Sequence, residues 1–160
     1  MRLGIISDTH GHVDLTRPAL RMFESLEVEA VLHCGDIGSV AVVELFAAWP
    51  AHFVFGNCDT DTHNFATAIA RLGQTCHGLF GDLQFDGVRV ALLHSHEQRR
   101  FRQTIDSGDY ALVCYGHTHV AAIDRHGGTV VLNPGAIYRA NPHSVAVVEL
   151  PTLEACIVEL

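Results

Sequence analysis

Residues 3–10 read LGIISDTH, a short apolar run typical of a buried strand that ends on Asp8 and His10. Four further apolar runs end on comparable residues: AVLHC on Gly35-Asp36, HFVF on Gly56-Asn57, RVALL on His94, and ALVCY on Gly116-His117-Thr118-His119. In an open α/β sheet the ligand crevice lies beyond the carboxyl ends of the strands. We therefore expect these side chains, although distant in sequence, to converge on one pocket.

The side chains at these strand ends are those that bind divalent metals. They are two aspartates, one asparagine and four histidines: Asp8, His10, Asp36, Asn57, His94, His117 and His119. Imidazole and carboxylate ligands without thiolate suit Mn, Fe, Zn, Ni or Co, and disfavour a structural zinc site. A carboxylate has two oxygens and can bridge a pair of ions about 3.5–4 Å apart, an arrangement used to hydrolyse phosphate esters. The pattern predicts a two-metal hydrolytic site.

The order of elements changes halfway along the chain. Apolar periodicity and end signals predict helices over 14–26, 39–48, 62–72 and 97–107. Turn signals predict hairpins around Asp86-Gly87, around 126–128 and across 151–152. Strands that alternate with helices imply parallel pairing, whereas the later hairpins imply antiparallel pairing. We predict an α/β protein with two stacked sheets and helices on the outer faces, in one domain over 1–160.

Composition excludes several classes of function. The formal net charge is −8 and all ten basic residues are arginine, so the chain has neither a P-loop lysine nor a Schiff-base lysine. An acidic chain without a basic stretch is a poor candidate for binding nucleic acid or anionic membranes. The longest apolar region, 40–55, is interrupted by polar residues and proline, so we expect no membrane span. Five separated cysteines and the lack of a signal peptide predict free thiols and a cytoplasmic protein.

Taken together, these motifs resemble the calcineurin-like metallophosphoesterase superfamily, and in particular its small, cap-less phosphodiesterases, which are related to the retromer scaffold subunit. The resemblance runs from Leu3 to about Gly135. It implies a four-layer αββα sandwich of two mixed sheets flanked by helices. It also implies two divalent ions, manganese being the first choice. One ion would be held by Asp8, His10 and His119, the other by Asn57, His94 and His117, with Asp36 bridging them.

The function implied is that of a metal-dependent phosphoesterase, most specifically a phosphodiesterase. A metal-bridging hydroxide would attack phosphorus in a small phosphate-ester substrate. The alternative is a catalytically weak, metal-binding scaffold or interaction module of the retromer-subunit type. The chain has the expected residue at all seven ligand positions, which favours the enzyme over the scaffold. The sequence does not predict the oligomeric state.

Two positions depart from the family pattern. Cys58 stands where the wider superfamily has histidine, and a thiol is a poorer general acid near neutrality than an imidazole. Protonation of the leaving group would then fall to Asp59, a metal-bound water or His96. The predicted catalytic residues are Asp36, Asn57, Cys58, Asp59, His94 and His96. Ser95 stands where the family has glycine, and its hydroxyl either narrows the pocket or hydrogen-bonds the turn.

Overall fold

The computed structural model describes all 160 residues, which form two β-sheets and four helices. The first sheet has six strands in the order β11-β10-β1-β2-β3-β4. Its strands are β1 (Arg2–Ile6), β2 (Ala30–His33), β3 (Ala51–Phe53), β4 (Thr75–Cys76), β10 (Ser144–Glu149) and β11 (Glu154–Glu159). Strands β1 to β4 pair in parallel, whereas β10 pairs antiparallel with both β1 and β11. The sheet is therefore mixed, as predicted.

The second sheet has five strands in the order β5-β6-β7-β9-β8. Its strands are β5 (Phe80–Phe85), β6 (Val88–Leu93), β7 (Leu112–Cys114), β8 (Ala122–His126) and β9 (Thr129–Asn133). The β5–β6 and β8–β9 pairs are the predicted hairpins, and β6, β7 and β9 run parallel. This sheet is mixed as well.

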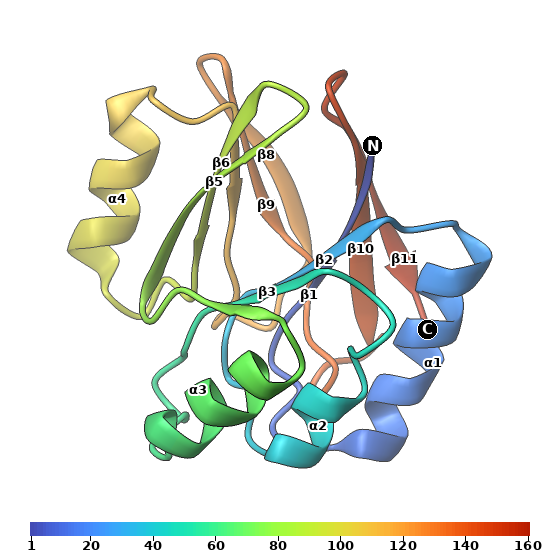
Figure 1. Ribbon diagram of the computed structural model, residues 1–160. Coiled ribbons are helices and arrows are strands. Elements are labelled where there is room, and N and C mark those ends of the chain that lie inside the picture. Colours follow the sequence, from blue (N-terminus) through green and yellow to red (C-terminus); the bar gives the residue numbers. More distant parts are fainter.

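The helices cover the two outer faces of the stacked sheets (Figure 1). Helices α1 (Val13–Ser25), α2 (Val40–Glu44) and α3 (Thr62–Arg71) pack on the first sheet, whereas α4 (Gln98–Ser107) packs on the second. Between the sheets, apolar side chains such as Leu32 and Leu92 form a shared core. The predicted four-layer αββα sandwich is confirmed.

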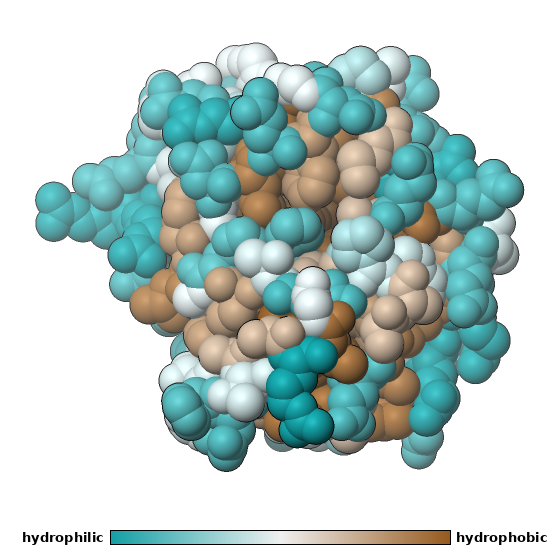
Figure 2. Space-filling model, viewed as in Figure 1, coloured by the Kyte–Doolittle hydropathy of each residue, from teal (hydrophilic) through white to brown (hydrophobic).

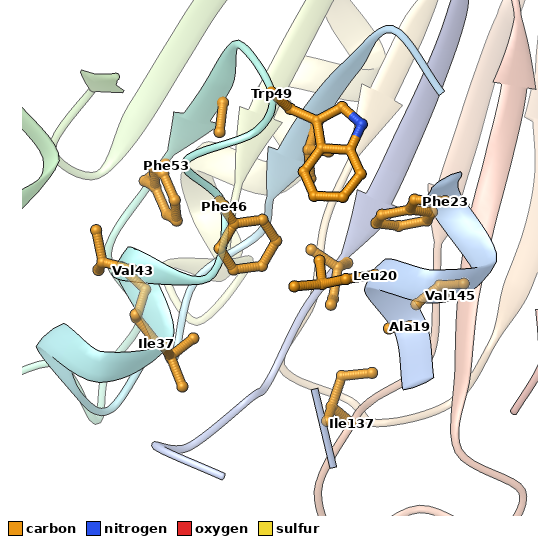
Figure 3. Close-up of a cluster of buried hydrophobic side chains, with 14 of the residues drawn as sticks. Ala19, Leu20, Phe23, Ile37, Val43, Phe46, Trp49, Phe53, Ile137 and Val145 are labelled. Carbon is orange, nitrogen blue, oxygen red and sulfur yellow. The ribbon is translucent and has the colours of Figure 1, made fainter. Parts of the chain in front are cut away.

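Aromatic and aliphatic side chains together form the core between the first sheet and its helices (Figure 3). Phe46 meets Phe53 edge-on, with 5.5 Å between ring centroids, and Phe23 of α1 is fully buried nearby. The indole nitrogen of Trp49 donates a hydrogen bond to the Val28 carbonyl at 3.0 Å. This packing fixes α1 and α2 against β1 to β3, whose carboxyl ends bear the predicted ligands.

Helix α2 is shorter than the predicted 39–48. Ser39 caps it as expected, since its hydroxyl accepts a hydrogen bond from the Val42 amide at 3.3 Å. After Glu44 the chain continues in tight turns, in which amides bond to the carbonyl three residues earlier, up to Trp49. Burial of Phe46 and Trp49 in the core, followed by Pro50, explains why the regular helix stops early.

The surface is largely hydrophilic around the margin of the face shown in Figure 2, in keeping with the acidic composition. No helix has the length and apolar character needed to span a membrane. All five cysteines are free, as predicted.

Candidate metal centre

The loops after β1, β2, β3, β6 and β7 meet at one edge of the sandwich. Their backbone is unusually strained, because left-handed φ values are costly for residues other than glycine. Five of the seven predicted metal ligands have such values: Asp8 (55°), His10 (43°), Asp36 (55°), His117 (75°) and His119 (60°). Strain of this kind persists only where the surrounding structure enforces it, and it clusters at functional sites.

The first group of candidate ligands comprises Asp8, His10 and His119, whose ligand atoms all lie within 4.8 Å of one another. Asp8 Oδ1 is 3.1 Å from His119 Nε2 and 3.7 Å from His10 Nε2. The Asp8 side chain is fully buried, yet its Oδ1 accepts no hydrogen bond. His10 Nε2 is also buried and has no hydrogen-bond partner. Buried polar atoms without partners are costly, and a cation between these three residues would satisfy them. These residues therefore fit a metal ion.

The second group lies around His94, which is nearly fully buried. His94 Nε2 is 3.1 Å from Asn57 Oδ1, and its ring lies 5.1 Å from that of His117. His94 Nδ1 lies 2.8 Å from the Cys34 carbonyl, which can only accept a hydrogen bond. In the neutral ring the proton is therefore on Nδ1, so Nε2 would offer its lone pair to a metal ion.

Asp36 lies between the two groups. Its Oδ2 is 3.5 Å from His10 Nε2 and 3.3 Å from His94 Nε2, while Oδ1 accepts a hydrogen bond from the Cys58 amide at 2.9 Å. Burial acts to raise the pKa of Asp36, but contact with His94 and the bond from Cys58 outweigh it and hold the pKa well below its usual range. The same contact with Asp36 raises the pKa of His94 despite its burial. Asp36 is thus an ionised carboxylate within reach of both groups.

Two glycines permit the close approach of these loops. A Cβ atom at Gly56 would lie 2.0 Å from Asp36 Oδ1, and one at Gly116 would lie 2.0 Å from Ser7 Oγ. Real Cβ contacts are not that short, so any side chain at either position must displace the neighbouring group. Glycine before Asn57 and before His117 is therefore required by packing.

Asp59 joins two of the ligand-bearing loops. Its buried carboxylate accepts hydrogen bonds from the amides of Gly56 (2.9 Å), Ile37 (3.2 Å) and Gly38 (3.0 Å). These bonds fix the loop of Asp36 against that of Asn57. They favour a positioning role for Asp59, whereas the role of proton donor stays a prediction.

His33 forms hydrogen bonds with residues of the loops after β1 and β2. Its Nδ1 accepts a hydrogen bond from the Gly35 amide at 3.2 Å, and its Nε2 bonds to Thr9 Oγ1 at 2.9 Å. Complete burial lowers the pKa of His33 to about 3, so the ring is neutral. Thr9 in turn donates to the Ile37 carbonyl at 3.0 Å, which links the loops after β1 and β2.

Besides Asp59, three residues depart from the family pattern or are candidate acids, and their surroundings differ. Cys58 is exposed, and partial burial and the neighbouring Asp36 raise its pKa, which disfavours a thiolate nucleophile. His96 lies beside His94, with 5.5 Å between rings, and burial lowers its pKa. The Ser95 hydroxyl donates to the Gly116 carbonyl at 3.2 Å, so it hydrogen-bonds the turn.

The structure also shows contacts at Ser7, Cys58 and Tyr138 that the sequence alone does not indicate. Ser7 Oγ donates to Asp8 Oδ2 at 2.5 Å, which turns the other oxygen toward the histidines. Cys58 belongs to a third possible ligand group, with His10 and Asp36. Tyr138 bonds through its amide to the Asp8 carbonyl at 3.1 Å, and its ring stacks on His12 at 4.0 Å. Ser7 adjoins a predicted ligand in sequence, but nothing local marks Tyr138.

Comparison with known proteins identifies the family of this chain. Residues 1–153 match the family model described as the calcineurin-like phosphoesterase superfamily domain. The chain is 32% identical over 138 residues to phosphodiesterase MJ0936 of Methanocaldococcus jannaschii, covering 84% of this chain and 83% of that protein. It is 30% identical over 141 residues to the probable metallophosphoesterase YsnB of Bacillus subtilis, covering 86% and 75%.

Solved structures give the same result. A structure described as a novel archaeal phosphodiesterase superposes with a TM-score of 0.93 at 28% identity, over 100% of both chains. Vps29 of Chaetomium thermophilum has the same fold, with a TM-score of 0.74 at 12% identity over 100% of this chain and 95% of that one. The match to the family model spans nearly the whole chain, and the fold agrees with that of a solved phosphodiesterase structure. This protein belongs to the calcineurin-like phosphoesterase superfamily.

Proposed function

We propose that this protein is a phosphodiesterase that depends on two divalent metal ions. The observation that carries the proposal is the position of Asp36 Oδ2, within 3.5 Å of both His10 Nε2 and His94 Nε2. An ionised carboxylate between two clusters of imidazole and carboxamide ligands is what a shared ligand of two ions requires. The phosphodiesterase named among its relatives, at 32% identity, supports the choice of substrate class.

Each ion would have its own set of ligands. Asp8, His10 and His119 would hold one, and Asn57, His94 and His117 would hold the other, with Asp36 shared. When bound, such a pair of ions activates water for attack on phosphorus and offsets the charge on the phosphoryl oxygens. The donor set suits manganese, and it also suits nickel, iron, zinc and cobalt.

The protein's own residues prepare the ligands for this task. The Cys34 carbonyl fixes the His94 tautomer, and Ser7 together with the His117 amide holds Asp8 Oδ2, so that Oδ1 is free for a cation. Partners of this kind orient metal ligands and raise their basicity. The candidate ligands thus need little rearrangement to bind metal.

Leaving-group protonation is the weaker part of the site. The raised pKa of Cys58 keeps its thiol protonated at neutral pH, but a thiol with so high a pKa is a weak acid. The lowered pKa of His96 leaves its imidazole mostly neutral, so only a small fraction can donate a proton. We infer that the enzyme hydrolyses esters with good leaving groups far faster than esters with poor ones.

Metal content and activity, measured together, test the proposal. Purified protein should bind about two ions by elemental analysis and hydrolyse bis(4-nitrophenyl) phosphate with added Mn²⁺ or Ni²⁺. Asp36→Asn should lose both properties, whereas Asp106→Asn, an exposed change on α4, should retain both. Wild-type protein that binds no metal and is as inert as Asp36→Asn would refute the proposal.

The alternative of a scaffold module rests on the likeness to Vps29, which at 12% identity concerns the fold alone. All seven candidate ligand residues are present and lie at one edge of the sandwich. That convergence favours the enzyme.

A further inference from the structure

A cavity of about 280 Å³ lies directly beside the candidate metal centre. His119, one of the first group of candidate ligands, forms part of its wall. The remaining lining comes from Val120, Ala121, Asn141, Pro142, Ser144, Ile157 and Glu159. The cavity therefore lies between the end of β11 and the loop that leads into β8.

We propose that this cavity binds the second, uncharged ester arm of the phosphodiester, the arm that is not the leaving group. The inference rests on the proposed function. A phosphodiester held next to His119 would direct one arm to the leaving-group side and would leave the other free to lie against the protein beside His119. The cavity is the space that opens from His119 itself.

The size of the cavity fits one arm and no more. Pockets that enclose a whole drug-sized ligand occupy about 300–1,000 Å³, so 280 Å³ suits a fragment such as one aryl ring or one sugar. Val120, at 65% exposure, is the most exposed large hydrophobic residue of the chain and lies next to His119. A residue so exposed gains free energy when an apolar arm covers it.

The charges around the cavity exclude an anionic arm. No arginine lines it, and the chain has no lysine, whereas the Glu159 carboxylate does line it. An anion held close to Glu159 would be repelled, and no basic side chain in the cavity wall would compensate. The exposed amide of Asn141 can donate and accept hydrogen bonds, which suits a neutral polar group such as a hydroxyl.

The test compares esters that share a nitrophenolate leaving group and differ only in the second arm. The substrates are methyl 4-nitrophenyl phosphate, bis(4-nitrophenyl) phosphate and 4-carboxyphenyl 4-nitrophenyl phosphate. Ala121→Phe fills the cavity, and should lower the kcat/KM ratio of the bis-aryl ester to the methyl ester by about tenfold. Ala48→Phe places the same bulk on an exposed turn far from the cavity and should leave this ratio unchanged.

Glu159→Gln provides a second variant at an exposed position, where folding is not at risk. It should raise kcat/KM for the carboxyphenyl ester relative to the bis-aryl ester by several-fold, because the repulsion is removed. Calorimetric titration with diphenyl phosphate gives a readout independent of turnover, and Ala121→Phe should weaken that binding. If the variants are active but both kcat/KM ratios stay at their wild-type values, the cavity does not bind the second arm. The proposal that the protein is a phosphodiesterase would remain valid in that case. Wild-type protein that is inert toward all three esters would overturn both proposals.

Discussion

Asp59 offers the sharpest test of how the site is held together. Its carboxylate accepts hydrogen bonds from three backbone amides, those of Gly56, Ile37 and Gly38, and is almost completely buried. Hydrogen bonds to a charged group contribute about 1.5–3 kcal/mol each. Asp59→Asn keeps an acceptor for the two amides on one oxygen, but places an NH₂ group against the third. We expect it to lower the free energy of unfolding by about 2 kcal/mol, and Asp59→Ala by on the order of 4 kcal/mol.

The same change should loosen the metal centre, because the three amides belong to the loops that carry Asp36 and Asn57. Replacing a group that orients metal ligands typically weakens metal affinity by about 10–100-fold. We expect a loss of this size for Mn²⁺ in Asp59→Asn. A residue that acted only as a proton donor would leave metal affinity as it was, so this measurement separates the two roles of Asp59.

The assay is urea unfolding of the metal-free protein, followed by titration of the folded protein with Mn²⁺. Asp61→Asn is the matched control, since Asp61 is exposed and two residues away, and its carboxylate accepts a hydrogen bond only from the Asn64 side chain. If Asp59→Asn is no less stable than Asp61→Asn and binds Mn²⁺ equally well, the three hydrogen bonds do not position the loops.

Three further perturbations follow from the structure. Gly56→Ala forces a Cβ atom into the Asp36 carboxylate, and should lower the free energy of unfolding by about 1–3 kcal/mol and abolish metal binding. Gly128→Ala, which has open space around it, should change neither property. Equal effects of the two changes in calorimetry and metal analysis would contradict the packing argument. Burial and the neighbouring His77 lower the pKa of His52 to about 4, below its value near 6.5 in the unfolded chain. The contribution of neutral His52 to stability is therefore complete above pH 6.5 and is lost as the pH falls toward 4. His52→Gln should therefore flatten the decline of stability over this interval, while His63→Gln, on the exposed side of α3, should reproduce the wild-type curve. Cys58→His should accelerate the hydrolysis of esters with poor leaving groups on the order of 10²-fold, and should change the hydrolysis of nitrophenyl esters little. If both ester types gain equally, or if Cys58→His is no faster than Cys58→Ser, residue 58 takes no part in proton transfer.

Much of the architecture follows from local sequence signals. Alternating strands and helices predict parallel pairing of β1 to β4, and the Asp86-Gly87 and Gly127-Gly128 turns predict the two hairpins of the second sheet. The convergence of the strand-end residues follows from the geometry of open sheets. These signals are local, or depend on a general rule of topology.

Other features depend on contacts between distant segments, which one sequence does not specify. The antiparallel return of β10 beside β1 joins residues almost 150 positions apart, and no local signal selects that partner. The early end of α2 comes from burial of Phe46 and Trp49 rather than from helix propensity. Likewise, the stacking of Tyr138 on His12 and the cavity beside His119 arise only after the two sheets have met.

Rigidity at the metal centre and weakness at the proposed acid have a common consequence for selectivity. Left-handed backbone at five candidate ligands, supported by Asp59 and His33, holds the ligand atoms in place before any ion arrives. Preorganised charge at these ligands acts on the phosphoryl group, which all phosphodiesters share. Protonation of the leaving oxygen, by contrast, depends on Cys58 or His96, neither of which has a pKa favourable for an acid near pH 7. Selectivity among phosphodiesters should therefore come from the acidity of the leaving alcohol and the fit of the second arm, rather than from the metal centre itself.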